Sequence, residues 1–201
     1  MTEHADYLPG MGKAWLLPLY DPLTRLLGVR GVHRELVERA QLAPGLRVLE
    51  IGCGTGNLAL AAKRREPGAE VTGLDPDPAA LAKGRRKAAR ARLTLRFDQG
   101  FAQALPYPDA SFDRVLSSLM LHHLDDADRP AALREVRRVL EPGGSLHVLD
   151  LAGTSHGPRR LRHHADGRIP ELMVQAGFSE AGESGTTKTR AGRCAFWTAR
   201  A

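Results

Sequence analysis

The stretch VLEIGCGTGN, residues 48–57, combines a short apolar run with three glycines at alternating positions. A buried strand that enters a glycine-rich turn and then a helix is typical of α/β domains. Glycine allows positive φ at such a turn, and its missing Cβ lets the backbone approach a ligand closely. Because open α/β sheets bind ligands at the carboxyl ends of their strands, this loop predicts a binding site.

The spacing of the glycines excludes two common phosphate-binding loops. The dinucleotide pattern G-x-G-x-x-G requires a third glycine at position 57, where this chain has Asn57. A P-loop requires Gly-Lys followed by Ser or Thr, and no such sequence follows Gly56. A nicotinamide-dependent oxidoreductase is therefore disfavoured, and the loop need not hold phosphates.

An acidic residue, Asp75, lies 19 residues after Gly56, where the next expected strand ends. The next apolar run, residues 71–74, ends at Asp75. A carboxylate at the end of the second strand points into the ligand crevice and accepts hydrogen bonds from ribose hydroxyls. The alternative role is to cap the helix expected at residues 79–91, but Asp77 suits that position better. The loop and Asp75 together predict a nucleoside site.

From about Leu42 onward, apolar runs alternate with helical patterns. This predicts an α/β fold with a Rossmann-like, doubly wound, mostly parallel seven-stranded sheet. Strands are expected at residues 47–51, 71–74, 93–97, 112–117 and 146–150, and helices at residues 58–65, 79–91 and 132–140. The tail predicts a short helix at 169–176 and an antiparallel C-terminal edge hairpin from 178–183 and 193–198. Two N-terminal helices are expected at 15–27 and 32–42.

Composition narrows the class of protein. Of 201 residues, 42% are hydrophobic and 26% are charged, as in ordinary globular domains. Two cysteines, Cys53 and Cys194, are too few for a disulfide framework or a structural zinc site, so no metal is expected. The chain shows no apolar run of membrane-spanning length and no secretory signal core, which predicts a cytoplasmic protein. The net charge of +6 indicates either an anionic partner or the arginine and alanine bias of a GC-rich genome.

Three features together carry a family resemblance: EIGCGTG at residues 50–56, Asp75, and LPYPDASFD at residues 105–113. With LYDP at 19–22 and LAPG at 42–45, they resemble the class I S-adenosylmethionine-dependent methyltransferases. Within that class, the chain is similar to the branch that contains the ubiquinone and menaquinone biosynthesis methyltransferases. The resemblance implies S-adenosyl-L-methionine as the cofactor and in-line methyl transfer to a small organic molecule, at O, N or C.

The resemblance also implies cofactor roles. Glu50 and the backbone of residues 52–56 would hold the methionine part, and Asp75 the ribose, with Pro76 beside the adenine. Ser117 would present its carbonyl to the cofactor's amino group. Residues 100–102 would read the adenine. Phe101 stands where the family often has an aspartate, and it offers a ring that can stack on the base and a backbone N–H, but no carboxylate. The expected cofactor site consists of Glu50, Gly52, Cys53, Gly54, Gly56, Asn57, Asp75, Pro76, Gly100, Phe101, Ala102 and Ser117.

Methyl transfer from a sulfonium needs alignment and exclusion of water more than an elaborate catalytic group. Where the acceptor must lose a proton, a nearby base helps. His122 and His123, just past the fourth strand, are the candidate bases, because histidine titrates near neutral pH. A framework role, with a bond to the backbone, is the alternative. Tyr20 is a candidate for a lid over the methyl group, against simple packing.

The expected organisation is a single methyltransferase domain over residues 1–201. It comprises an N-terminal helical lid (1–44), a cofactor-binding core (45–152) and a C-terminal helix with edge strands (153–201). Two other functions are compatible with the cofactor residues: a regulatory or partner protein that binds the cofactor without turnover, and an RNA or protein methyltransferase. Nucleic acid is disfavoured, because the basic run at residues 84–92 has no interleaved aromatic side chains for base stacking.

Overall fold

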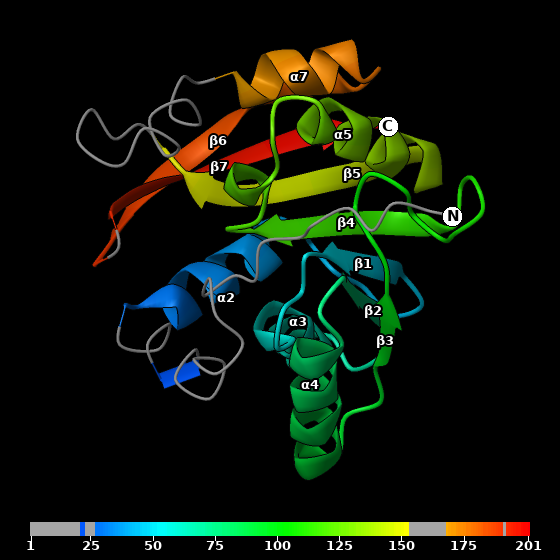
Figure 1. The fold of residues 1–201 in the computed structure, drawn as a ribbon, viewed down its shortest axis with the longest axis vertical. Coiled ribbons are helices and arrows are strands. Elements are labelled where there is room, and N and C mark those ends of the chain that lie inside the picture. The colour runs from blue at the N-terminus through cyan, green and yellow to red at the C-terminus, as the bar shows by residue number, and fades with distance from the viewer. Residues whose placement is uncertain (1–20, 23–26, 153–167, 191) are drawn as a thin grey trace, which may run out of the picture.

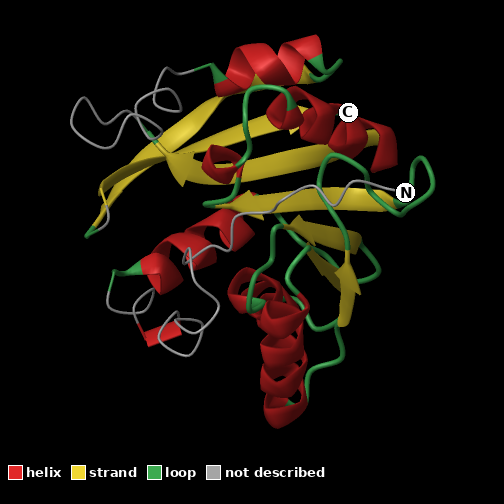
Figure 2. Cartoon of the chain, in the orientation of Figure 1, coloured by secondary structure: helices red, strands yellow, loops and turns green. Residues whose placement is uncertain are grey.

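The computed structural model describes residues 21–22, 27–152, 168–190 and 192–201. Its strands are β1 (Arg47–Ile51), β2 (Glu70–Asp75), β3 (Arg96–Gln99), β4 (Phe112–Ser118), β5 (Leu140–Leu151), β6 (Ser179–Thr189) and β7 (Gly192–Arg200). They form one sheet in the order β3-β2-β1-β4-β5-β7-β6 (Figures 1 and 2). The first five strands are parallel, and β7 and β6 follow antiparallel. The predicted fold class, including the C-terminal edge hairpin, is confirmed.

Helices cover both faces of this sheet. Among the described residues they are α2 (Val29–Arg39), α3 (Asn57–Arg65), α4 (Pro78–Ala91), α5 (Asp128–Val139) and α7 (Ile169–Gln175), together with the 3-10 turn η2 (Leu121–His123). Leu133 of α5 and Met173 of α7 are buried in one core, and Leu36 of α2 and Leu58 of α3 in another. Figure 1 shows α5 and α7 together on one side of the sheet, and α2 and α3 on the other.

Some element boundaries differ from the sequence expectations. The strand expected at 93–97 is β3, which begins only at Arg96, because Arg92 ends α4 in the left-handed region and Leu93 N–H still bonds to the Ala88 carbonyl. The edge strand β6 extends to Thr189 through a register shift near Gly185, well beyond the expected residue 183.

The N-terminal helices are only partly described. The helix expected at 32–42 is α2, which begins earlier, at Val29, and ends at Arg39. Of the helix expected at 15–27, residues 21–22 are helical, and most of the remainder lies outside the described residues. No helix of the described residues is both long enough and apolar enough to cross a membrane.

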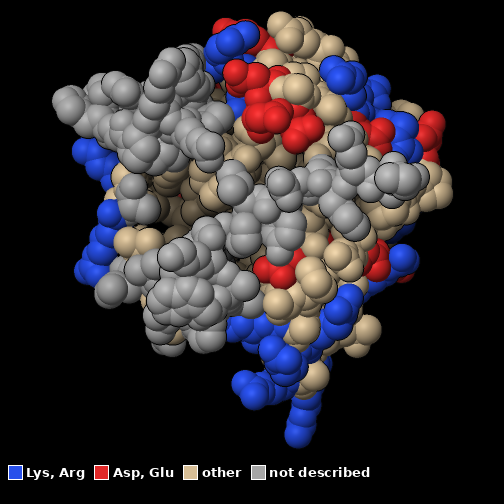
Figure 3. Space-filling view, in the orientation of Figure 1, with Lys and Arg blue, Asp and Glu red and all other residues tan. Residues whose placement is uncertain are grey.

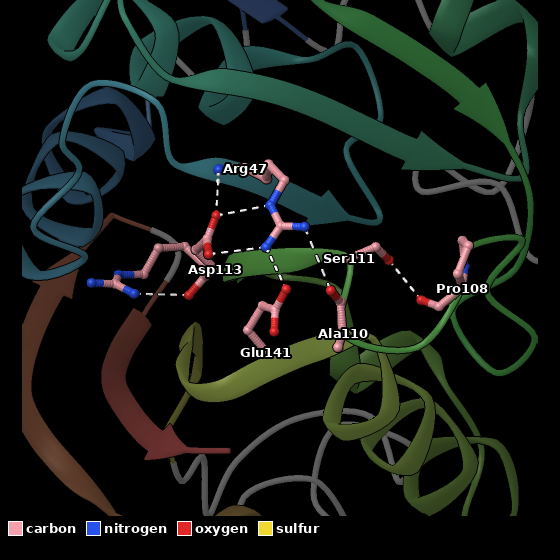
Figure 4. Close-up of polar contacts among 7 residues, drawn as sticks. Arg47, Pro108, Ala110, Ser111, Asp113 and Glu141 are labelled. Carbon is pink, nitrogen blue, oxygen red and sulfur yellow. Dashed lines mark hydrogen bonds and ion pairs between the residues drawn. The ribbon is translucent and has the colours of Figure 1, made fainter.

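One polar cluster joins three strands at their amino ends (Figure 4). The Arg47 backbone N–H and Nε both donate to Asp113 Oδ2, at 2.8 and 3.1 Å, and its Nη2 donates to Asp113 Oδ1 and to Glu141 Oε1. The hydrogen bond from Arg47 lowers the pKa of Asp113. We call Arg47, Asp113 and Glu141 the amino-edge clamp. Asp113 of the LPYPDASFD segment thus lies at the edge opposite the glycine loop and ties β1, β4 and β5 together.

Candidate functional site

The glycine loop follows β1 in a conformation that requires its glycines. Gly52, Gly54 and Gly56 have φ values of +66°, +50° and +73°, in the region that side chains disfavour. A Cβ on Gly52 would collide with the Met120 side chain, and one on Gly56 would lie 2.7 Å from Phe97 Cε1. The loop therefore packs directly on its neighbours and has its bare backbone at the carboxyl edge of the sheet.

Glu50 fixes the start of α3 to the sheet. Its carboxylate is 3% exposed and accepts a 2.6 Å hydrogen bond from the Ala59 backbone N–H in the first turn of the helix. Burial raises its pKa well above the usual value. The carboxyl group lies beside the glycine loop, where the resemblance expects it to meet the methionine part of the cofactor.

Asp75 connects the end of β2 to the glycine loop. Its Oδ2 accepts from Gly54 N–H at 2.7 Å, and its Oδ1 accepts from Asp77 N–H at 2.9 Å. The Asp77 side chain caps α4 by accepting from Ala79 N–H at 2.8 Å, as predicted. Since a carboxylate oxygen accepts more than one hydrogen bond, Asp75 retains capacity for ribose hydroxyls. Burial raises its pKa.

The segment expected to read adenine lies next to Asp75. Gly100 N–H donates to the Asp75 carbonyl at 3.2 Å, and Phe101 forms an isolated bridge with Ala104. Pro76 is half-buried, and its carbonyl accepts from the Gln99 side chain at 3.1 Å. These contacts place the segment beside the ribose candidate, and adenine binding by residues 100–102 remains a prediction.

Three predicted cofactor residues have side chains that are engaged elsewhere or enclosed. Cys53 is buried in the core with Phe97, and burial raises the pKa of its thiol. Asn57 donates to Asp21 Oδ1 and accepts from Lys87 Nζ at 2.6 Å. Ser117 is fully buried, and its Oγ has no hydrogen-bond partner among the described residues. Contact with the cofactor through the backbone of these residues remains a prediction.

A cluster that the sequence reasoning does not anticipate surrounds Asp21. Its Oδ1 accepts from Thr55 Oγ1 at 2.6 Å, Asn57 Nδ2 at 2.9 Å and Lys87 Nζ at 3.2 Å. Lys83 Nζ lies 2.9 Å from Oδ2. We call Asp21, Thr55, Asn57, Lys83 and Lys87 the Asp21 network. The two lysines, one helical turn apart on α4, are the signal that could have revealed it.

The rim after β4 contains a second polar pair. His122 Nδ1 lies 2.6 Å from Asp150 Oδ1, and His122 N–H donates to Asp150 Oδ2 at 3.2 Å. Asp150, near the end of β5, is only 2% exposed and is absent from the residues predicted for the site. His123 is exposed, with its ring centroid 4.1 Å from that of His122. Tyr20 lies outside the described residues.

His122 and Asp150 line a cavity of about 300 Å³ between η2, α5 and α7. Leu121, Ile169 and Leu172 give it an apolar wall, while Arg129 and Arg168 bring positive charge. His123 is not among the lining residues. The described residues contain no group of three or more His, Cys, Asp or Glu suited to hold a metal ion.

Basic side chains gather over α4 on the molecular surface (Figure 3). The exposed residues of this helix include Arg85, Arg86 and Arg90, whereas Lys87 turns inward to the Asp21 network. The helix carries no aromatic side chain between these charges. This surface therefore has the character of a solvated helix face and lacks the stacking groups of a nucleic-acid site.

Comparison with known proteins gives consistent matches. Residues 48–144 match the family model described as a methyltransferase domain. Demethylmenaquinone methyltransferase from Deinococcus radiodurans is 39% identical over 147 residues, which are 72% of this chain and 60% of that protein. The Thermus thermophilus protein of the same name is 43% identical over 138 residues, covering 67% and 62%. The chain thus spans about three fifths of the length of these curated relatives.

Structure comparison agrees on the fold. A SAM-dependent methyltransferase from Aquifex aeolicus superposes with a TM-score of 0.66 and 18% identity, over 84% of this chain and 88% of that one. With the glycine loop and Asp75 in place, the chain belongs to the class I S-adenosylmethionine-dependent methyltransferases. Within this class, it lies near the ubiquinone and menaquinone branch.

Proposed function

We propose that the protein transfers the methyl group of S-adenosyl-L-methionine to a small organic acceptor. The observation that carries this proposal is the junction of the glycine loop with Asp75, through the 2.7 Å bond from Gly54 N–H. It places an acidic side chain beside a bare backbone loop at the carboxyl edge of a parallel sheet, where nucleoside ligands bind. The names of the relatives make a demethylmenaquinone the first acceptor to test.

The described residues fit the cofactor. Gly54 has open space where a Cβ would stand, Glu50 lies just before the loop, and Asp75 is bonded to its middle residue. In this proposal, Glu50 and the loop hold the methionine part, and Asp75 accepts from the ribose hydroxyls. Residues 100–102, with Pro76, enclose the adenine, and the Phe101 ring stacks on it.

The chain's own contribution to the reaction is alignment. The cofactor, when bound, supplies a methyl group already activated on a sulfonium. The glycine loop and Asp75 fix the nucleoside at the carboxyl edge of the sheet. The acceptor then approaches from the neighbouring part of that edge, near η2. Orientation of this kind supplies a large part of the acceleration of a displacement reaction.

Calorimetric titration with S-adenosylmethionine and with its demethylated product tests cofactor binding. We expect both to bind, and undetectable binding of both at millimolar concentration would refute the proposal. Asp75→Ala should weaken binding by about 1–3 kcal/mol, because charge-assisted hydrogen bonds are lost. Asp109→Ala is the matched control, because Asp109 is 78% exposed and bonds to Arg138 away from the glycine loop. An unchanged affinity in Asp75→Ala would exclude the ribose role.

Turnover separates an enzyme from a cofactor-binding regulator. We expect methyl transfer from labelled cofactor to at least one reduced quinone or small phenol. Transfer only to RNA or protein would show that the acceptor is a macromolecule and not a small molecule. Cofactor binding without transfer to any acceptor would favour the regulatory function. We also propose a cytoplasmic location, to be tested by fractionation of cells that contain the tagged protein.

A further inference from the structure

The cavity between η2, α5 and α7 contains side chains that can bind a small molecule other than the cofactor. We infer that this cavity is the acceptor subsite and that His122, oriented by Asp150, removes the proton from an acidic hydroxyl of the acceptor. The inference rests on the proposed function and adds the chemical class of the acceptor. It assigns Asp150 as a positioning residue.

The His122 ring is held in one orientation. Asp150 Oδ1 lies 2.6 Å from Nδ1, and a carboxylate can only accept, so Nδ1 carries the proton. The lone pair is then on Nε2, for which no hydrogen-bond partner is found among the described residues. An aspartate that fixes a histidine tautomer in this way makes the opposite nitrogen a base.

Asp150 is itself firmly placed. It is 2% exposed, and it accepts from the backbone N–H groups of His122 at 3.2 Å and Leu151 at 2.7 Å in addition to the ring. The carboxylate therefore fixes the backbone of η2 and the ring together. A bond to the backbone alone would suffice for a framework role, whereas the short bond to Nδ1 orients the imidazole as well.

The cavity fits a small, partly apolar acceptor. Its volume of about 300 Å³ lies at the lower end of the usual range for ligand pockets. Leu121, Ile169 and Leu172 suit one face of an aromatic ring. The Arg129 guanidinium donates to the Leu121 and Leu124 carbonyls and so fixes η2. It also lies 3.7 Å from Asp126, another lining residue, so the second lining guanidinium, that of Arg168, is the group placed to favour an oxyanion.

The cavity and the cofactor loop are joined through a short stretch of chain. Met120 lies against Gly52 so closely that no side chain fits at that glycine. His122 follows two residues later. The chain therefore passes from the contact with the start of the glycine loop to the cavity lining within two residues.

The proposed reaction consists of a proton transfer to His122 and a methyl transfer to the acceptor. The acceptor O–H bond breaks, its proton moves to His122 Nε2, and the oxygen keeps the electron pair. That pair, or the ring carbon conjugated with it, forms the new bond to the methyl group as the sulfur–methyl bond breaks and its electrons remain on sulfur. The products are the methylated acceptor, the demethylated cofactor and a protonated His122.

The test uses 4-nitrophenol, whose ionised form absorbs visible light, with full-length protein saturated with the demethylated cofactor. At a pH at which the free probe is mostly protonated, we expect wild-type protein to bind the probe and to increase its phenolate absorbance several-fold. His122→Gln should bind the probe without this increase. Asp150→Asn should reduce the increase, while calorimetry still shows cofactor binding.

His123→Gln tests the competing base. Retention of the phenolate signal in this variant supports the inference, and its loss here with retention in His122→Gln would overturn it. Failure of wild-type protein to bind or ionise the probe would also overturn it, even when the cofactor binds. Absence of cofactor binding would instead refute the proposed function. Thermal unfolding of each variant identifies any that fail to fold, and His122→Asn then replaces a misfolded His122→Gln.

Discussion

The Asp21 carboxylate accepts a 2.6 Å hydrogen bond from the Thr55 hydroxyl, which lies 34 positions further along the chain. Thr55 is buried between two glycines of the cofactor loop, so this bond attaches the chain ahead of α2 to that loop. Burial alone would raise the pKa of Asp21, but the bonds from Thr55, Lys83 and Asn57 lower it to about 2. The carboxylate is therefore charged throughout the physiological range.

Asp21→Asn should weaken both folding and cofactor binding. The substitution keeps the shape of the side chain but leaves Lys83 and Lys87 close together without their counter-charge. We expect a loss of about 1 kcal/mol in the free energy of unfolding, as for partly exposed charged pairs, and a few-fold weaker affinity for the demethylated cofactor. Urea unfolding and calorimetry measure the two effects. Asp109→Asn, an exposed ion pair elsewhere, should change neither, and equal behaviour of the two variants would contradict the role of Asp21.

Alanine at Gly56 should cost more stability than alanine at Gly54. Both glycines have positive φ, so both substitutions strain the backbone by about 1 kcal/mol. At Gly56 the added methyl also meets the Phe97 ring at 2.7 Å, whereas nothing lies within 4 Å of a Cβ at Gly54. Overpacking of this kind adds roughly 1–3 kcal/mol.

Urea unfolding of Gly54→Ala and Gly56→Ala measures this difference directly. Phe97→Leu combined with Gly56→Ala should recover part of the loss, because the smaller side chain vacates the contested space. Equal destabilisation by the two single substitutions would show that backbone strain alone accounts for both.

The amino-edge clamp should contribute to stability without influence on the cofactor. Asp113→Asn weakens the paired hydrogen bonds from Arg47, and we expect the free energy of unfolding to fall by about 1 kcal/mol. Cofactor affinity should not change, since the glycine loop lies at the other ends of the same strands. A large loss of affinity in a folded Asp113→Asn protein would contradict this separation.

Two buried histidines should make the fold sensitive to mild acid. Burial lowers the pKa of His33 and of His147 to about 4, from an ordinary value near 6.5. Between these values the unfolded chain binds protons that the folded protein excludes, so stability falls as pH decreases from about 6.5 to about 4. His33 bonds to Ser118 Oγ at 3.0 Å, and His147 to Ser145 Oγ at 2.9 Å.

Urea unfolding across this pH range measures that dependence. His33→Gln and His147→Gln should each flatten the curve, because glutamine bonds to the serine without titrating. A wild-type curve that stays level between pH 6.5 and 4 would exclude the effect.

The sequence predicted the parallel core of the sheet well because local signals there agree. Alternating apolar runs and the glycine loop define β1, α3 and β2, and Asp77 caps α4 as its position suggests. The predicted boundaries of an element were wrong where tertiary contacts override the local sequence pattern. β6 is half exposed along its length, so its register comes from pairing with β7 and not from its own residues.

The candidate site was predictable only where the spacing of residues along the chain follows a recognisable pattern. The glycine loop and Asp75 are visible from spacing, and the structure joins them by a hydrogen bond, while their role in binding the cofactor stays a prediction. Asp150 lies 28 residues from His122 and Lys83 lies 62 from Asp21, so the spacing of two lysines on α4 indicates a partner but not which residue it is, and nothing near His122 indicates Asp150. Contacts of this kind depend on how crossover connections place separate strands and helices side by side.

The amino-edge clamp has a consequence for how acceptor specificity can change. It secures three strands at the end of the sheet that carries no proposed ligand residue, whereas the cavity is formed by η2, α5 and α7 at the other end. Substitutions at cavity residues such as Leu172 can therefore alter the shape of the pocket without loosening those strands. If the cavity is the acceptor subsite proposed above, this separation makes its wall the region in which to select variants with new substrates.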